Sequence, residues 1–465
     1  MTRAAFRRFL APLALAQFIC SFAGSNMNVM INDITEDLDT TVQGVQATIT
    51  LFLLIMAILM IPCSKLSDRW GRKRCFTAGL VLYGIGALIS ALSPGLGVLI
   101  LGNSVLEGIG TALLIPPVYI LTTLKFEDFN TRVRAFGVIS GLGGIGAAAG
   151  PLIGGLITTA ISWRAAFVFQ VLVVATIVLL SRRMADPVAP DPARPFDAGG
   201  AILWAVGMFF VVFGILQADS NGALMAGLLA AGAVFLVWFF LYIRARERAG
   251  TEPLLSTGLF KNRVSNLGLV TQNIQWLLLM GVSFVVAVFL QTVRGYNAIE
   301  TGVIFTAATL GVLATSLAAG RLAKRAPQRT LIMAGFVLTG AGIGLLLALV
   351  GASSRVVAFA PGLLLIGLGL GLMLTPSVSL VQSSFPERLQ GEISGLSRSV
   401  SNLGSSFGTA IAGTILVSDL GSGNTSYVIA LVVLAVLAIV GLAAAIRLPA
   451  PDRERAAHAA GAAIR

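Results

Sequence analysis

The chain has 465 residues, of which 56% are hydrophobic and only 11% are charged. This composition excludes an ordinary soluble protein and indicates many membrane spans. The formal net charge of +12 would favour nucleic acid as the partner of a soluble domain, but here Lys and Arg are dispersed among short segments between apolar runs. We therefore interpret the charge as a membrane-orientation signal and expect no nucleic-acid partner.

Runs of about 20 mostly apolar residues predict helices that cross a hydrocarbon core of roughly 30 Å. We count fourteen, at residues 9–32, 45–63, 75–94, 97–121, 134–158, 163–182, 198–216, 223–243, 265–291, 300–319, 329–350, 357–381, 391–417 and 425–446. An even number puts both termini on one side. If that side is cytoplasmic, only Arg164, Arg294 and Arg355 of the 32 basic residues lie outside, with Arg398 counted inside a span. The bias predicts a multi-pass protein of the cell (inner) membrane with both termini in the cytoplasm.

The most charged predicted loop, Ser64–Arg74, joins the second and third spans and reads SKLSDRWGRKR. A generic cytoplasmic loop would explain its basic residues but not Asp68 and Gly71 at their spacing. The loop resembles the pattern G-x-L-a-D-R-x-G-R-K-x of the major facilitator superfamily, with Ser64 in place of the first Gly. The matching positions are Leu66, Asp68, Arg69, Gly71, Arg72 and Lys73. The resemblance implies that Asp68, Arg69, Gly71, Arg72, Lys73 and Arg74 form a conformational latch.

The two ends of the chain repeat each other. The loop at Ser64 is echoed by GRLAKRAPQRT at Gly320, and ISGL at Ile139 recurs at Ile393. We therefore predict an all-α integral membrane protein with two six-helix bundles in pseudo-symmetric repeat and two inserted helices. The predicted divisions are an N-terminal bundle (1–185), linkers with the inserted helices (186–263), a C-terminal bundle (264–447) and a cytoplasmic tail (448–465).

A stretch rich in small residues, GIGAAAGPLIGG, lies in the fifth predicted span. It is similar to g-x-x-x-G-P-x-x-G-G, which in the superfamily marks exporters that work as antiporters. The matching residues are Gly146, Gly150, Pro151, Gly154 and Gly155. Ordinary close packing of helices would explain the same residues. Together with fourteen spans, the motif resembles the drug:proton antiporter branch, which implies a proton gradient and no cofactor.

That branch usually has an Asp in the first helix and an Arg in the fourth, where this chain has Ala23 or Ser25, and Ser104. Glu107 is the only carboxylate predicted near the bilayer midplane, where burial favours a protonated form, so it is the first candidate for proton coupling. A neutral structural Glu bonded to a neighbouring helix remains the alternative. Asp33 is a second candidate, nearer the outer surface.

Polar and flexible side chains in the first and ninth spans predict a substrate cavity. The predicted cavity residues are Asn26, Met27, Asn28, Met30, Asn32, Gln272, Gln275, Trp276 and Arg398. Packing between amides would also explain the Asn and Gln residues. Arg398 could bind an anionic group or extend toward the cytoplasmic face.

We interpret the chain as a proton-coupled exporter of amphipathic drugs or toxic compounds that works by alternating access. A lipid exporter on the same fold is the alternative, and a non-transporting membrane sensor is a third reading. The sequence shows no nucleophile with a base, no phosphate loop and no metal-ligand spacing among Cys20, Cys63, Cys75 and His458, so we expect neither an enzyme nor a metal site. We expect a monomer in the lipid bilayer that binds a small amphipathic molecule or a lipid.

Overall fold

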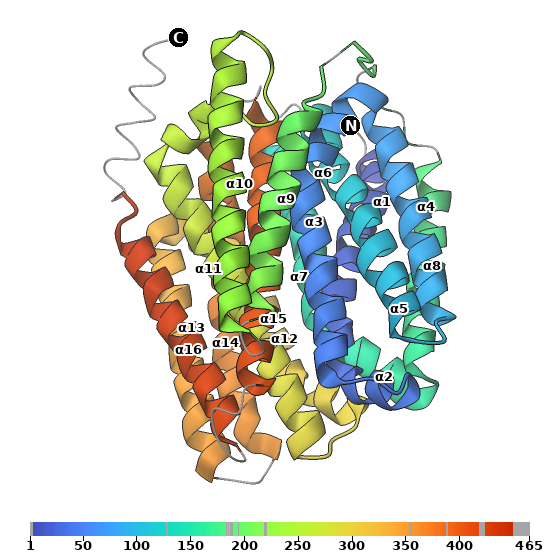
Figure 1. Cartoon of the computed structure of the whole chain (residues 1–465), viewed down its shortest axis with the longest axis vertical. Coiled ribbons are helices and arrows are strands. Elements are labelled where there is room, and N and C mark those ends of the chain that lie inside the picture. Colours follow the sequence, from blue (N-terminus) through green and yellow to red (C-terminus); the bar gives the residue numbers. More distant parts are fainter. Residues whose placement is uncertain are drawn as a thin grey trace.

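The protein is described by a computed structural model that covers residues 3–126, 129–182, 184, 186, 189–193, 195–217, 221–352, 356–386, 389–417 and 424–449. All regular structure in those ranges is helical, and the long helices run side by side (Figure 1). Most of the predicted tail, 448–465, lies outside the described residues.

The helices follow the predicted spans along the chain. The first part contains α1 (Arg3–Asn26), η1 (Met27–Val29), α2 (Ile31–Asp37), α3 (Val42–Trp70), α4 (Arg72–Ala91), α5 (Leu96–Leu99), η2 (Ile100–Glu107), α6 (Gly108–Lys125), α7 (Phe129–Ala160) and α8 (Trp163–Ser181). The middle contains α9 (Ala198–Ile215), α10 (Gly222–Arg248) and η3 (Thr257–Lys261). The last part contains α11 (Arg263–Val288), η4 (Phe289–Val293), α12 (Ala298–Arg325), α13 (Gln328–Ala352), η5 (Val356–Phe359), α14 (Ala360–Ser383), α15 (Gln390–Val417) and α16 (Thr425–Ile446).

Twelve of the described helical runs are long and apolar enough to cross a membrane, and α7 makes a thirteenth if its two bent parts are counted as one span. Helix α15 is not among them because it is rich in Ser and Thr. Those side chains are buried against other helices rather than facing lipid, as at Ser397, Ser399, Ser406 and Thr409.

The predicted charged loop between the second and third spans is almost entirely helical, which corrects the span ends drawn from hydropathy. Helix α3 continues to Trp70 and α4 begins at Arg72, so Gly71 alone makes the turn. Its φ of 99° is a conformation that side chains disfavour. Helices can extend beyond the apolar core with charged side chains in water, so hydropathy alone cannot locate their ends.

Two seams join the first part of the chain to the last. Helix α3 lies along α15, and α7 lies along α12. The α3–α15 seam is polar along its length. Gln46 Nε2 donates to Thr409 O at 3.4 Å, and Ser64 Oγ donates to Gly391 O at 3.2 Å near the other end.

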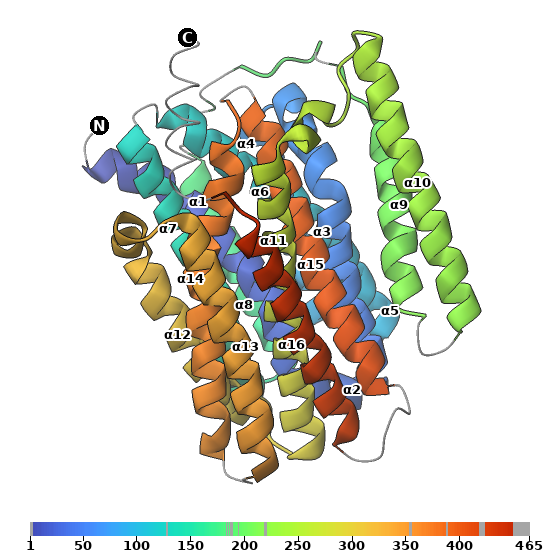
Figure 2. The same cartoon turned by 90° about the vertical axis from the view of Figure 1, so that its left-hand side faces the viewer.

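Helices α9 and α10 form a hairpin at the edge of the molecule (Figure 2). Helix α9 packs on α3 and α15, and Trp204 Nε1 donates to the carbonyl oxygen of Ile58 at 3.1 Å. Helix α10 is the most exposed of the candidate spans, with only 11% of its apolar window buried. The hairpin therefore adds to the α3–α15 seam without forming part of the space between the two parts of the chain.

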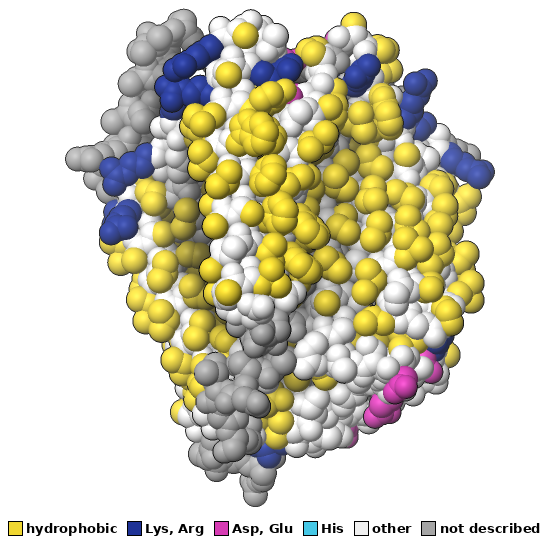
Figure 3. Space-filling model, in the orientation of Figure 1, with side chains coloured by type: hydrophobic (Ala, Val, Ile, Leu, Met, Phe, Trp, Pro, Cys, Tyr) yellow, Lys and Arg dark blue, Asp and Glu magenta, His cyan; other side chains and the backbone are white. Residues whose placement is uncertain are grey.

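Charge separates the two ends of the molecule. In Figure 3 hydrophobic side chains cover the middle, most visible Lys and Arg lie at the upper end, and the largest visible group of Asp and Glu lies at the lower end. Helix α1 begins at the upper end, and α2 lies at the lower end (Figure 1). We call these the basic end and the acidic end.

Candidate functional site

A cavity lies between the first and last parts of the chain, with walls from α1, α6, α7, α11, α12, α14 and α15. Its larger lobe has a volume of about 980 Å³. A smaller lobe of about 540 Å³ extends toward α3 and shares Gln17, Ser21, Ala147, Trp276 and Arg398 with the larger one. The two lobes therefore adjoin each other along a shared wall.

A polar chain crosses the cavity at the border between the lobes. The guanidinium of Arg398 on α15 lies 4.5 Å from the centre of the Tyr119 ring on α6 and donates a hydrogen bond to the Tyr119 hydroxyl. Tyr119 Oη donates to Gln17 Oε1 at 3.1 Å, and Gln17 Nε2 donates to Ser21 Oγ at 3.2 Å. Residues from three helices thus connect the last part of the chain to the first.

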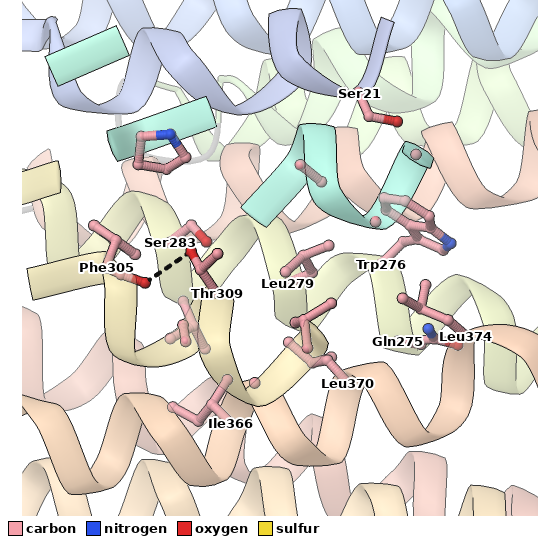
Figure 4. Close-up of a pocket in the computed structure, with 18 of the residues that line it drawn as sticks. Ser21, Gln275, Trp276, Leu279, Ser283, Phe305, Thr309, Ile366, Leu370 and Leu374 are labelled. Carbon is pink, nitrogen blue, oxygen red and sulfur yellow. Dashed lines mark hydrogen bonds between the residues drawn. The ribbon is translucent and has the colours of Figure 1, made fainter. Parts of the chain in front are cut away.

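The larger lobe is mostly apolar away from this chain. In Figure 4 Gln275, Trp276 and Leu374 lie toward one end of the lobe and Phe305 toward the other. The Oε1 atom of Gln275 is buried and has no hydrogen-bond partner among the described residues. It is therefore available to accept a hydrogen bond from a bound molecule.

Three of the predicted cavity residues, Gln275, Trp276 and Arg398, line the lobes. The other six do not line either lobe: Asn26, Met27, Asn28, Met30, Asn32 and Gln272. Both Met side chains are buried in the apolar core, and Gln272 accepts a hydrogen bond from Ser397 at 2.9 Å. A role of these six in substrate binding stays a prediction.

Gln291 on η4 joins the two parts of the chain near the acidic end. Its Oε1 accepts from the Asn32 backbone N–H at 3.1 Å, its carbonyl oxygen accepts from Asn32 Nδ2 at 3.0 Å, and its Nε2 donates to Asn28 O at 2.7 Å. The sequence analysis did not assign Gln291 a role, because its partners are 259 or more residues away and two of the partner atoms are backbone atoms.

Glu107 is fully buried at the end of η2, a π-helical stretch. Its Oε1 lies 3.4 Å from the Ser90 hydroxyl, which has a nearer acceptor in Gly86 O at 3.0 Å. Its Oε2 has no hydrogen-bond partner, and Glu107 forms no ion pair in the described part of the chain. A carboxyl group here is best satisfied when it carries a proton and donates to Ser90.

Glu107 lies behind the cavity wall and does not line either lobe. Helix α3 packs on η2, which carries Glu107, and also lines the smaller lobe. Asp33 lies beyond the first candidate span, in the first turn of α2. Burial raises the pKa of the Asp33 carboxyl above its ordinary value.

The predicted antiporter motif faces two neighbours. Gly146, Gly150 and Gly154 lie four residues apart on α7 and contact α1, where a Cβ on Gly154 would lie 3.0 Å from Asn26 Cβ. Gly155 contacts the backbone of Ala298 on α12, so a side chain there would collide with it. Helix α7 bends by 43° near Ala147. Pro151 lies four residues later and has no backbone N–H, so it cannot donate a hydrogen bond to the Ala147 carbonyl oxygen.

The predicted latch residues lie at the basic end, at the corner between α3 and α4. Arg72 Nη2 pairs with Asp68 Oδ1 at 2.7 Å, and the Lys73 backbone N–H donates to Asp186 Oδ2 at 3.1 Å. Arg69 and Arg74 are exposed.

Lys65, which we did not place in the latch, bridges the two parts of the chain. Its Nζ lies 2.8 Å from Glu392 Oε1 on α15 and 3.1 Å from Glu252 Oε1 after α10. Glu392 Oε2 also accepts from the Ser256 backbone N–H at 2.9 Å. We call Lys65, Glu252, Ser256 and Glu392 the basic-end junction.

Comparison with known proteins identifies a family and several relatives. The family model described as Major Facilitator Superfamily matches residues 13–409 and 275–464. The puromycin resistance protein of Streptomyces alboniger is 28% identical over 87% of this chain and 81% of its own length. The tetracenomycin C resistance and export protein of Streptomyces glaucescens is 29% identical over 83% of this chain and 72% of its own length. The multidrug efflux pump LfrA of Mycolicibacterium smegmatis is 28% identical over 87% of this chain and 80% of its own length.

A solved structure shares the fold. The crystal structure of a peptide transporter in complex with sulfate superposes with a TM-score of 0.68 over 94% of each chain, at 16% sequence identity.

Proposed function

Because the chain belongs to the major facilitator superfamily, a family of membrane transporters, we propose that it exports small amphipathic compounds from the cytoplasm in exchange for protons. The relatives named for drug resistance and export support this direction of transport. The observation that carries the proposal is the cavity between the two parts of the chain, which is mostly apolar and crossed by one polar chain.

The proposed topology has fourteen spans, with α15 and bent α7 added to the twelve candidates. Residues 1–185 and 264–447 form two six-helix bundles in pseudo-symmetric repeat, and residues 186–263 carry the inserted pair α9 and α10. The gathering of Lys and Arg at one end supports a cytoplasmic basic end with both termini there, in the cell membrane (Figure 3). The protein works as a monomer.

Transport proceeds by rocking of the two bundles about the cavity. The bonds of Gln291 hold the acidic end closed, and the Lys65–Glu392 pair holds the basic end along the α3–α15 seam. The Asp68–Arg72 corner acts as a latch that stabilises one state. Each end opens when its own set of polar contacts breaks while the set at the other end stays formed. The two ends therefore open alternately.

Glu107 carries the coupled proton. It is buried without an ion pair among the described residues and lines neither lobe of the cavity. Proton and cargo then do not compete for the same atoms. The coupling instead runs through α3, which packs on η2 and also lines the smaller lobe. Asp33 is the second proton site to test.

The test uses purified protein in liposomes whose interior is more acidic than the medium. An antiporter accumulates its cargo inside as protons leave, and a protonophore abolishes the accumulation. A cationic dye, an anionic dye and a fluorescent lipid serve as probes, with protein-free liposomes as the control. Equilibration without accumulation would contradict proton coupling, and movement of the lipid alone would favour the lipid exporter.

A further inference from the structure

Two charged side chains lie deep within the described helices. Only Arg398 and Glu107 are more than seven residues from both ends of a continuous helical run. Arg398 is eight residues after Gln390, where α15 begins, and Glu107 is eleven residues after Leu96, where α5 begins and continues through η2 into α6. Charges at such depth are costly in a membrane and mark functional positions.

The structure separates these two charges. Arg398 lines both lobes of the cavity, and Glu107 lines neither. Among the described residues that line the lobes, none is Asp or Glu, and Arg398 is the only Lys or Arg. The described lining of the cavity therefore carries a formal charge of +1.

No described carboxylate neutralises the guanidinium of Arg398. Its described contacts are the ring and hydroxyl of Tyr119, which are neutral. Arg398 forms no ion pair with any described carboxylate. The described hydrogen bond uses one N–H on Nη2, and a guanidinium has five N–H donors, so donors remain for a ligand.

We propose that the cargo is an aromatic anion, whose carboxylate or other anionic oxygen group binds Arg398 at the border of the two lobes. A guanidinium matches two oxygens of such a group with parallel hydrogen bonds. An anionic ligand would neutralise the buried charge, whereas a cationic ligand would be repelled by it. This assignment deepens the proposed export function and rests on it.

The rest of the cavity defines the scaffold of this anion. Trp276 lines both lobes together with Arg398, so a ring attached to the anionic group can stack on the indole. Phe305 and Leu370 offer apolar surface farther along the larger lobe (Figure 4). The unpartnered Oε1 of Gln275 selects a cargo that also has a hydroxyl or N–H donor.

The test compares two dyes that share a xanthene ring system, fluorescein as the anion and rhodamine 123 as the cation, at pH 7.5. Fluorescence anisotropy measures the binding of each dye to the purified protein. The variants are Arg398→Gln, Arg398→Lys and, as the matched control, Arg447→Gln, which removes an exposed arginine at the end of α16. Thermal melting checks that each variant is folded.

The parent and Arg447→Gln should bind fluorescein more tightly than rhodamine 123. Arg398→Gln should weaken fluorescein binding by roughly 10- to 100-fold, the loss expected for a charge-assisted hydrogen bond, without weakening rhodamine binding. Arg398→Lys should retain an intermediate affinity. Tighter binding of rhodamine 123 by the parent, no binding of fluorescein, or an equal loss of both dyes in Arg398→Gln would overturn the proposal.

A failure of this proposal can be told from a failure of the proposed function. If an acidic vesicle interior drives accumulation of rhodamine 123 but not of fluorescein, the protein is a proton-coupled transporter and the anion assignment is wrong. If neither dye accumulates in liposomes while fluorescein still binds through Arg398, the anion site stands and the export function fails. If the Arg398→Gln variant does not fold, the parent and Arg398→Lys still decide the selectivity.

Discussion

At the scale of single residues, the decisive group is a buried carboxyl that forms no ion pair within the described part of the chain. Glu107 has a Ser90 hydroxyl near one oxygen, and its other oxygen has no hydrogen-bond partner among the described residues. Replacement by Gln preserves the shape and provides an N–H donor for Ser90, but it cannot exchange a proton. The group can therefore be tested with little disturbance of the packing.

Glu107→Gln should abolish accumulation driven by a pH gradient while the cargo still binds with unchanged affinity. The measurement is dye accumulation in liposomes alongside anisotropy in detergent. Asp33→Asn is the matched control, because Asp33 is the other candidate carboxylate. If Glu107→Gln accumulates dye as the parent does and Asp33→Asn does not, the coupled proton belongs to Asp33.

Two carboxylates near the acidic end predict opposite effects of pH on stability. Hydrogen bonds from Arg164 and Trp163 lower the pKa of Asp37, while burial raises that of Asp33. The stabilisation from Asp37 is therefore present above its unfolded-state pKa and lost as pH falls through the lowered value. The charged form of Asp33 is disfavoured in the fold, so its contribution weakens as pH rises through the raised pKa.

Thermal melting in detergent between pH 3 and pH 7 measures both effects. Asp37→Asn should be less stable than the parent at pH 7, by no more than about 1 kcal/mol because the pair is exposed, and should approach the parent at pH 3. Asp33→Asn should be at least as stable as the parent at pH 7. Parallel melting curves for the parent and both variants would show that neither carboxylate is linked to folding.

The residue scale also shows what sequence reasoning reached. Glu107 and Arg398 could be selected from the sequence because a charge within an apolar run is rare. Arg398 lines the cavity and Glu107 does not. This difference depends on the rotation of each helix about its axis, which the weakly amphipathic pattern of such spans does not define. Gln291 and Lys65 were not selected because their partners come from distant parts of the chain.

At the scale of elements, the seams differ in chemistry. The α3–α15 seam is held by side-chain hydrogen bonds and the basic-end junction, whereas the α7–α12 seam has close backbone contacts at Gly155 and at Gly302. Small residues in a sequence predict close helix packing, but they do not name the helix that packs there. The motif on α7 in fact faces both α1 and α12.

Exchanging the charges of the junction should test whether it holds the basic end closed. Lys65→Glu places three carboxylates together and should open the seam, which slows transport severalfold. Adding Glu392→Lys should restore one opposite-charge pair and much of the rate. Transport rate in liposomes is the readout, and a double variant no better than Lys65→Glu would show that the pair does not act as a unit.

A side chain at Gly155 should prevent the acidic end from closing. In Gly155→Val the new atoms would meet the Ala298 backbone, which cannot move aside cheaply. Gly141→Val is the control, because a Cβ at Gly141 on the same helix has nothing within 4 Å. Transport should fall at least tenfold in the first variant and stay near the parent rate in the second. Equal rates would remove the backbone contact from the mechanism.

At the scale of the whole molecule, the orientation in the membrane can be measured by labelling the two ends of a single helix, α10. Ala223 and Ala249 are exposed at the acidic and basic ends of α10. In a background without Cys20, Cys63 and Cys75, Ala223→Cys should react with an impermeant maleimide in intact cells. Ala249→Cys should react only after permeabilisation. The reverse pattern would invert the proposed topology.

The order of the long helices was predictable because each apolar run is long enough to cross a bilayer. The hairpin of α9 and α10 was predicted as an insertion, but its contact with the α3–α15 seam was not. No local pattern links Trp204 to the carbonyl oxygen of Ile58, so only the folded chain reveals that contact.

Because η2 is π-helical, the position of Glu107 depends on the number of residues in this segment as well as on their identity. A π turn holds more residues than an α turn, and a single deletion can restore regular α-helix. Each residue of an α-helix advances the side chains by about 100° around the axis. Deleting one residue between Ile100 and Leu106 should therefore leave the faces of α5 and α6 in place, whereas a deletion within α6 would turn the segments on either side of it by about 100°. Relatives that are one residue shorter here can keep the same face against α4, so alignments through this helix need a gap placed within η2.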